Sequence, residues 1–256
     1  MQSLRLYGVV TNPDRQKGRG MKFAESDVKK FAIEKKLRIF QPEKVKENVE
    51  FINQIKELSP DIICVVAYGK ILPKEILDIP SKGCINLHAS LLPKYRGAAP
   101  IQWAVLNGDK VTGVSTMYMN EKMDEGDIIL QKETEIGEYE TTGELWDRLQ
   151  IIGADLLVET VKQINKGIAP RVKQGKDFSL APMLNKQMAK IDFTKSMEEI
   201  KNKIYGLNPI MGAYVIYNSK KIKLWKVEML SNETASKVAN KSISEEIEMR
   251  NDTSCR

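Results

Sequence analysis

The amino-acid sequence predicts an α/β protein with a mainly parallel sheet. In the first half, short apolar runs with strand character alternate with segments whose apolar residues recur at helical spacing. This alternation is typical of consecutive β-α-β units, whose strands lie parallel in one sheet. A long amphipathic segment after residue 141 ends the alternation. The chain has 256 residues, 42% of them hydrophobic, which is enough for one large domain or two smaller ones.

The expected strands are apolar runs that end at turn-forming residues. The first, LRLYGVV at 4–10, is followed by TNPDRQKGRG, a cluster of turn formers and cations that predicts a loop. Further strands are expected at 37–40 (LRIF), 61–68 (DIICVVAY), 83–88 (GCINLH) and 113–119 (GVSTMYM), with another around Ile128.

Helices are expected between these strands. Ser26 can cap a helix that runs to about Lys36, a second helix carries the apolar residues of 49–55, and a third covers 101–106. Thr141 and Glu144 form a capping-box pattern that opens the long amphipathic helix, which we expect to close a first domain at 1–170. Its expected apolar face comprises Leu145, Leu149, Ile152, Leu156, Leu157, Val161 and Ile164.

The remainder of the chain divides into three expected segments. Residues 171–206 have little periodicity and predict a linker, with a short helix boxed by Ser196 and Glu199 near its end. Within 207–230, AYVIY, Asn218-Ser219 and KIKLWKV predict a β-hairpin. Residues 231–256 are rich in Ser, Asn, Glu and Lys, which predicts a disordered tail.

Charge and cysteine content bound the partners and the compartment. The net charge of +6 favours an anionic partner, although a modest lysine excess more often serves solubility. Cys64 and Cys84 lie in apolar runs, where a free thiol packs as a small hydrophobe, and Cys255 is far from both. We therefore expect a soluble protein in the reducing cytoplasm. The apolar run from Ile62 is far shorter than the roughly 20 residues of a membrane-spanning helix.

One constellation of polar residues has the parts for acyl transfer. Asn86 and His88 are two apart in a strand, so their side chains share a face at the strand's carboxyl end, where α/β sheets bind ligands. Asp124 directly follows the strand GVSTMYM and is expected at a neighbouring strand end. An amide, an imidazole and a carboxylate together supply an oxyanion donor, a proton carrier and a group that orients it.

Simpler interpretations of these residues remain open on this evidence. A lone histidine is often a hydrogen-bonded packing residue, and an aspartate beside glycine is often a turn residue. Ser90 lacks the G-x-S-x-G setting of a hydrolase nucleophile, so direct attack by the substrate's own nitrogen is favoured. One histidine without paired cysteines predicts no zinc site, and the glycine fingerprints of nucleotide-binding loops are absent from the sequence.

The stretch GCINLHASLLPKYRGAAPIQWAVLNGDKVTGVSTMYMNEKMDEGDIIL resembles the signature region of the folate-dependent formyltransferases. Its SLLPKYRGAAPIQWA form is similar to that of the methionyl-tRNA formyltransferases. VVTNPDRQKGRG and VVAYGKILPKEIL before it, and AKIDFTKSMEEIKNKIYGLNPIMGAY after it, extend the resemblance to roughly 9–227. It implies a Rossmann-like formyltransferase fold and formyl transfer from 10-formyltetrahydrofolate to the amino group of methionyl initiator tRNA, without a metal.

The resemblance also implies roles for individual residues. By motif position, Asn86 and protonated His88 would stabilise the oxyanion, while Asp124 would keep His88 charged and help to relay a proton. The implied folate-binding residues are Ser90, Leu91, Leu92 and Pro93, with Lys70, Ile71 and Leu72. The implied tRNA-binding residues are Arg15, Lys17, Arg19 and Lys22, of which Arg19 is the preferred contact; we expect a monomer without membrane contact.

The sequence departs from the family's pattern at both ends. The family has a strand and helix before the residues that match VVTNPDR, and we expect this chain to lack them, which would leave a gap or unpaired edges in the sheet. Only the hairpin of 207–230 resembles the family's C-terminal barrel of the oligonucleotide-binding type, so we expect a truncated barrel domain. Two alternatives stay open: a formyltransferase for another amine, such as a sugar nucleotide or glycinamide ribotide, and a truncated, inactive family member.

Overall fold

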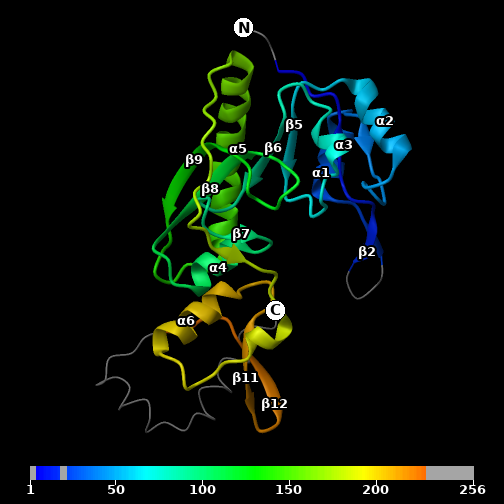
Figure 1. The fold of residues 1–256 in the computed structure, drawn as a ribbon. Helices are drawn as coiled ribbons and strands as arrows, with labels where there is room; N and C mark the ends of the chain where they lie inside the picture. Colours follow the sequence, from blue (N-terminus) through cyan, green and yellow to red (C-terminus); the bar gives the residue numbers. More distant parts are fainter. Residues whose placement is uncertain (1–3, 18–21, 229–256) are drawn as a thin grey trace.

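The computed structural model describes residues 4–17 and 22–228 and is drawn as a ribbon in Figure 1. Arg19 and the expected tail of 231–256 lie outside the described residues. The core of the fold is a four-stranded sheet in the order β5 (Ile63–Val66), β6 (Cys84–His88), β8 (Val111–Tyr118) and β9 (Ile128–Glu135). These strands match the apolar runs of the sequence.

The direction of the strands changes across this sheet. β5 and β6 are parallel, whereas β8 is antiparallel to β6 and β9 is antiparallel to β8. A separate parallel pair is formed by β1 (Val9–Val10) and β4 (Ile39–Phe40). The β-α-β rhythm of the sequence therefore accounts for the two parallel pairs, and the last two strands extend the sheet as an antiparallel ribbon.

The expected gap in the sheet is confirmed. Within the described residues, β1 pairs only with β4 and β5 pairs on one edge only, with β6. The β1–β4 pair and the four-stranded sheet are joined near their strand ends, where the Asn12 amide donates to the Tyr68 carbonyl oxygen at 3.1 Å. The Lys70 ammonium adds a second bridge, to the Pro42 carbonyl oxygen at 2.8 Å.

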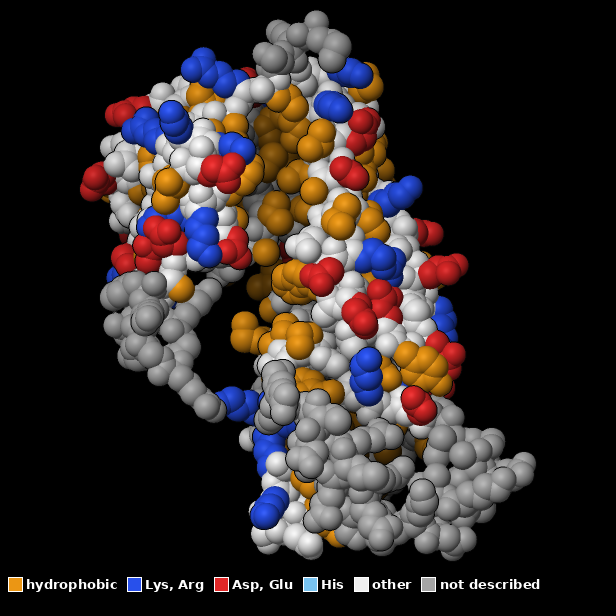
Figure 2. All heavy atoms as spheres, turned by 180° about the vertical axis from the view of Figure 1, so that it is seen from behind, with side chains coloured by type: hydrophobic (Ala, Val, Ile, Leu, Met, Phe, Trp, Pro, Cys, Tyr) orange, Lys and Arg blue, Asp and Glu red, His pale blue; other side chains and the backbone are white. Residues whose placement is uncertain are grey.

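This open edge changes the environment of the strands beside it. The expected strand at 4–10 is confirmed only at its end, because β1 begins at Val9, and Leu4 and Leu6 are more than half exposed. Cys64 on β5 is likewise exposed, contrary to its expected packing role, and only Cys84 is buried. Figure 2 shows hydrophobic side chains lining the hollow between the part that contains β1 and the part that contains α5.

Helices pack against the sheet as the periodicity predicts. Ser26 caps the first helix by accepting a hydrogen bond from the Lys29 backbone amide at 3.1 Å. The helices of the first 110 residues are α1 (Asp27–Glu34), α2 (Val49–Leu58), the short α3 (Lys74–Leu77) and α4 (Pro100–Leu106). α2 and α3 bury a small core together with β4, which includes Phe40, Phe51 and Ile76.

The long amphipathic helix α5 (Thr142–Lys166) crosses β8 and β9. Its capping box is present: the Thr141 hydroxyl accepts from the Glu144 amide, and the Glu144 carboxylate accepts from the Thr141 amide. Leu145 and Leu149 on the expected apolar face are fully buried against the sheet and α4. The helix ends at Lys166 and is capped by Gly167, whose φ of 71° is the left-handed conformation that glycine adopts readily.

The expected linker contains regular structure that contacts the first domain. Its elements are β10 (Leu180–Ala181), the 3-10 helix η1 (Lys186–Ala189) and α6 (Met197–Gly206). β10 pairs with β7 (Arg96–Gly97), and Ser196 and Glu199 form the predicted capping box of α6. The segment therefore packs against the first domain through β7.

Two hairpins complete the described residues. β11 (Ala213–Tyr217) and β12 (Lys220–Leu224) form the predicted hairpin, with positive φ angles at Asn218 and Ser219, as a tight two-residue turn requires. β2 (Arg15–Lys17) and β3 (Lys22–Ala24) form the second, which projects from the N-terminal part in Figure 1. No helix among the described residues is long and apolar enough to cross a membrane.

Candidate active site

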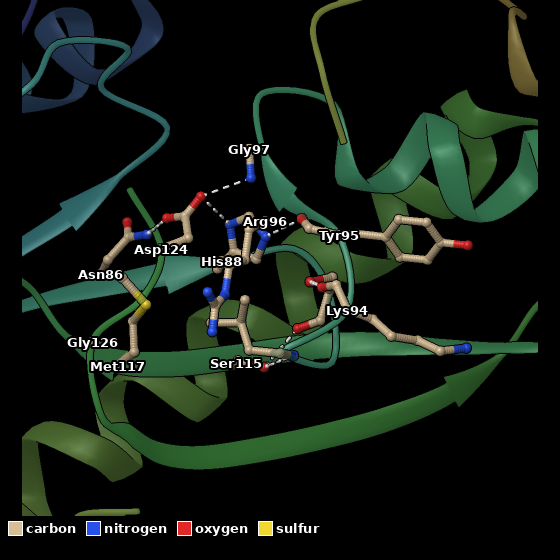
Figure 3. A network of polar contacts seen from close by, with 12 residues as sticks. Asn86, His88, Lys94, Tyr95, Arg96, Gly97, Ser115, Met117, Asp124 and Gly126 are labelled. Carbon is tan, nitrogen blue, oxygen red and sulfur yellow. Dashed lines mark hydrogen bonds and ion pairs between the residues drawn. The ribbon is translucent and has the colours of Figure 1, made fainter. Parts of the chain in front are cut away.

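Asn86, His88 and Asp124 come together at one place on the central sheet (Figure 3). Asn86 and His88 are two residues apart on β6, so their side chains lie on the same face of the strand. The Asn86 amide donates to Oδ1 of Asp124 at 3.3 Å, and Nδ1 of His88 lies 3.6 Å from Oδ2. The expected grouping is therefore present, with the carboxylate joining the amide and the imidazole.

The route by which Asp124 reaches this site differs from the expected one. Because β8 is antiparallel to β6, Tyr118 at its end pairs with Ile85, near the start of β6. The loop after β8 must therefore fold back along the sheet to bring Asp124 beside His88. Asp124 has a φ of 52°, a left-handed conformation that aspartate tolerates better than most residues. The assumption of neighbouring strand ends was wrong, although the predicted contact is correct.

Gly97 holds the Asp124 carboxylate in place. Its backbone N–H donates to Oδ2 of Asp124 at 2.9 Å. Gly97 has a φ of 126°, and a Cβ atom at this position would lie 2.7 Å from the Ala181 carbonyl oxygen. Glycine is therefore required here both for the backbone conformation and for the close approach of β10.

Gln174, from the expected linker, fixes the backbone of the same loop. Its amide nitrogen donates to the carbonyl oxygens of Asp124 and Gly126, each at 2.8 Å. Its amide oxygen accepts from Nε of Arg96 at 2.9 Å, and the nearly buried Arg96 guanidinium lies over the Phe178 ring. The sequence analysis missed these residues. No local signal in the sequence marked Gln174.

A hydrogen bond to the Tyr95 carbonyl oxygen orients the His88 ring. Nε2 lies 2.8 Å from the Tyr95 carbonyl oxygen. A carbonyl oxygen can only accept, so Nε2 carries a hydrogen and donates. Nδ1 is the ring nitrogen that faces Asp124. The imidazole is 6% exposed, so bulk water has little access to it.

The loop after β6 is fastened to the sheet. The Ser115 hydroxyl donates to the Ser90 carbonyl oxygen at 2.6 Å and accepts from the Leu92 amide at 3.0 Å. Ser90 and Leu92 are buried, so their side chains stabilise the loop. Leu91 and Pro93 are partly exposed, so they are the members of the expected folate-contacting loop whose side chains can meet a ligand.

The three residues expected to complete the folate pocket have different environments. The Lys70 ammonium donates to two backbone carbonyl oxygens of the loop after β4, those of Pro42 and Glu43. Leu72 is buried in the small core of the N-terminal part. Ile71 is 77% exposed, and of the three its side chain is the most available to a ligand.

The expected basic loop is the β2–β3 hairpin. Arg15 at the start of β2 is exposed, and the register places Lys17 opposite Lys22. The hydrogen-bonded ladder thus extends further into the segment than the predicted loop. Among the residues that the structure describes, no group of three or more His, Cys, Asp or Glu side chains could hold a metal ion.

Comparisons with known proteins identify the family of this chain. Residues 2–161 match the model of the formyl transferase family, and residues 183–252 match that of the formyl transferase C-terminal domain, which begins within the expected linker. The methionyl-tRNA formyltransferase of Clostridioides difficile strain 630 is 50% identical over 238 residues, which cover 93% of this chain and 77% of that protein.

Solved structures share the fold at low sequence identity. A 4-N formyltransferase from Francisella tularensis has a TM-score of 0.65 at 23% identity, over 79% of this chain and 83% of that one. HypX from Aquifex aeolicus, solved in complex with tetrahydrofolic acid, has a TM-score of 0.62 at 15% identity, over 76% of this chain and 34% of that one. By its match to the family model and its identity to these relatives, the chain belongs to the formyl transferase family.

Proposed function

We propose that this protein transfers the formyl group of 10-formyltetrahydrofolate to the α-amino group of methionyl initiator tRNA. The observation that carries the proposal is the carboxylate of Asp124, which contacts both the Asn86 amide and Nδ1 of His88 in a nearly buried setting. Relatives that are about half identical over most of the chain are named methionyl-tRNA formyltransferases, which supports the choice of acceptor.

The three side chains have complementary tasks in this reaction. The methionyl nitrogen attacks the formyl carbon, a C–N bond forms, and the bond from that carbon to the folate nitrogen breaks. Negative charge that develops on the formyl oxygen is stabilised by the Asn86 amide and by Nδ1–H of protonated His88. Asp124 keeps His88 charged, and the proton lost by the attacking amine is relayed to the departing folate nitrogen. The described chemistry needs no covalent bond to the protein.

The loop after β6 suits a flat, hydrogen-bonding pteridine. Leu91, Pro93 and Ile71 offer apolar surface, while Ser90, Leu92, Lys70 and Leu72 shape the surrounding loops from within. Pockets for such ligands are commonly apolar with a few fixed polar groups. The hydrogen bonds from Ser115 hold the loop in one conformation, which lowers the entropic cost of binding.

The β2–β3 hairpin is the proposed contact with the tRNA acceptor end, through Arg15, Lys17, Arg19 and Lys22. Lys17 and Lys22 occupy facing positions in the backbone register of the hairpin. Cationic residues favour an anionic partner such as a phosphate backbone, in line with the net charge of +6. We place the monomeric enzyme in the cytoplasm, and the free thiols of Cys64 and Cys84 are compatible with that compartment.

A sugar-nucleotide amine is the competing acceptor, because several structural neighbours are sugar formyltransferases. These neighbours are at most 23% identical, so they bear on the fold alone. The purified chain should be incubated with 10-formyltetrahydrofolate and either methionyl initiator tRNA or an amino-sugar nucleotide. We expect formylmethionyl-tRNA and no formylated sugar. A folded sample that formylates only the sugar, or neither acceptor, contradicts the proposal.

A further inference from the structure

A cavity of ≈ 180 Å³ lies beside the active site, between the first turns of α4 and α5 and the segments before and after α6. The described residues that line it are all uncharged. Five of them have large apolar side chains that come from the two sides of α6: Met183, Leu184, Leu207, Ile210 and Met211. None of these residues has a role in the site described above.

A single stretch of backbone joins the cavity to the catalytic groups. Gly97 donates its N–H to Asp124, and the next residue, Ala98, lines the cavity. Successive Cα atoms are about 3.8 Å apart, so the cavity wall begins one residue from the partner of the catalytic carboxylate. In an aminoacyl ester, the reacting amine and the side chain are bonded to the same carbon. When that amine lies beside Asp124, its side chain is therefore within a few bonds of the stretch of backbone that borders this cavity.

We propose that this cavity binds the side chain of the aminoacyl group whose amine accepts the formyl group. The inference rests on the proposed function and adds the contact that selects methionine among aminoacyl groups. An apolar cavity of about 150 Å³ holds a molecule the size of benzene, so the volume here fits one unbranched side chain. Thioether and aliphatic walls suit a methionine thioether, because these side chains are polarisable and adapt to the shape of a ligand.

Exposure and charge agree with this occupant. Met183 is 78% exposed and Ile210 is 69% exposed, so a bound side chain would remove apolar surface from water at the cavity mouth. A charged side chain would lose its hydration there without an ionic partner, which disfavours it strongly. The amide of Gln102, which has no hydrogen bond to another described residue, remains available at the wall for the ester or the terminal nucleotide.

The walls of the cavity are fixed relative to one another. The buried Thr142 hydroxyl, at the start of α5, donates to the Gly206 carbonyl oxygen at 2.8 Å. The next residue, Gly143, donates its N–H to the Asn208 carbonyl oxygen at 3.1 Å. These two bonds join the catalytic part to the segment after α6. The cavity is therefore formed before a ligand arrives, as discrimination between similar side chains requires.

The first test measures selectivity in the full-length protein. The variant M183A/I210A shortens both exposed side chains at the mouth, and I151A/M197A is the matched control at exposed positions outside the cavity. Initiator tRNA is charged with methionine or with alanine. We expect the ratio of kcat/KM for the two acceptors to fall roughly tenfold in M183A/I210A and to stay unchanged in the control. An unchanged ratio in M183A/I210A overturns the proposal.

The second test requires no catalysis, which separates this proposal from the proposed function. Saturation-transfer NMR with methioninamide reports contact between its methyl group and the protein. We expect transfer to the wild type and to I151A/M197A, and loss of transfer in M183A/I210A. Equal transfer to all three proteins, or none to the wild type, overturns the cavity assignment. If the expected transfer pattern is seen but no aminoacyl-tRNA is formylated, side-chain binding is supported and the proposed function is contradicted.

Discussion

Replacement of Gly97 by alanine tests how the active-site carboxylate is positioned. The added Cβ would lie 2.7 Å from the Ala181 carbonyl oxygen, a backbone atom that cannot move without displacing β10. The φ of 126° adds strain of about 1–3 kcal/mol for a residue with a side chain. The relief of this contact shifts the N–H that holds Asp124, and a displacement of about 1 Å at a catalytic group can cost about 100-fold in rate.

For Gly97→Ala we therefore expect a loss of roughly 2–4 kcal/mol in the free energy of unfolding, from the strain and the steric contact together. We also expect a fall in kcat of about 100-fold.

Two glycine controls separate the conformational strain from the steric contact. Gly167 has a φ of 71° with no atom within 4 Å of an added Cβ, so Gly167→Ala should show conformational strain alone, about 1 kcal/mol.

Gly175 has neither a close neighbour nor a positive φ, so Gly175→Ala should be neutral. Urea unfolding gives the stability of each variant, and initial rates of formylation give kcat. Stability and kcat of Gly97→Ala equal to those of Gly175→Ala would refute the reasoning. If Gly97→Ala has full stability but a reduced kcat, the role of the Gly97 N–H in positioning Asp124 is still supported. The predicted steric contact with β10 is then contradicted.

Three further changes probe the supports of the fold and the site. Gln174→Ala removes both hydrogen bonds to the Asp124 loop, so kcat should fall about tenfold or more with little change in KM, and unchanged kinetics would count against this support. The N–H and hydroxyl of Thr141 lower the pKa of Glu144 below its usual 4.5, so its stabilising effect is present above that pH and is lost as the pH falls through the folded pKa. Glu144→Gln should thus lower the free energy of unfolding near neutral pH by about 1 kcal/mol, because the helix cap is weakened. It should also reduce the loss of stability at acid pH, and urea unfolding that shows the same loss as in the wild type would contradict this. Burial raises the pKa of Cys84 to about 12, so a thiol reagent at pH 8 should label it only after denaturation, and mass spectrometry that finds it labelled in the native protein would contradict its burial.

The sequence predicted those features that depend on neighbouring residues. The capping boxes at Thr141 and Ser196 are local hydrogen-bond patterns, and both are present. The shared face of Asn86 and His88 follows from strand periodicity alone. The apolar face of α5 follows in the same way from helical periodicity.

Features that depend on distant pairing could not be predicted in this way. β8 runs antiparallel to β6, which no local pattern in the sequence indicates. The predicted path of the loop that carries Asp124 was therefore wrong, although Asp124 does lie beside His88 as expected. Gln174 lies in a segment without periodicity, and the bridge of Val172 to Ile128 and the pairing of β7 with β10 bring that segment to the site. Cys64 has the same apolar sequence context as a buried residue, but β5 has no neighbour on its other edge among the described strands.

The most direct test of the central claim is single-turnover formylation by Asp124→Asn, with Asp78→Asn as the carboxylate control on the exposed end of α3. The asparagine keeps the shape of the side chain but has no negative charge to place beside Nδ1 of His88. With methionyl initiator tRNA and 10-formyltetrahydrofolate, we expect a rate at least about 100-fold below wild type for Asp124→Asn, and a wild-type rate for Asp78→Asn. A folded Asp124→Asn protein that formylates methionyl-tRNA at the wild-type rate would contradict the account.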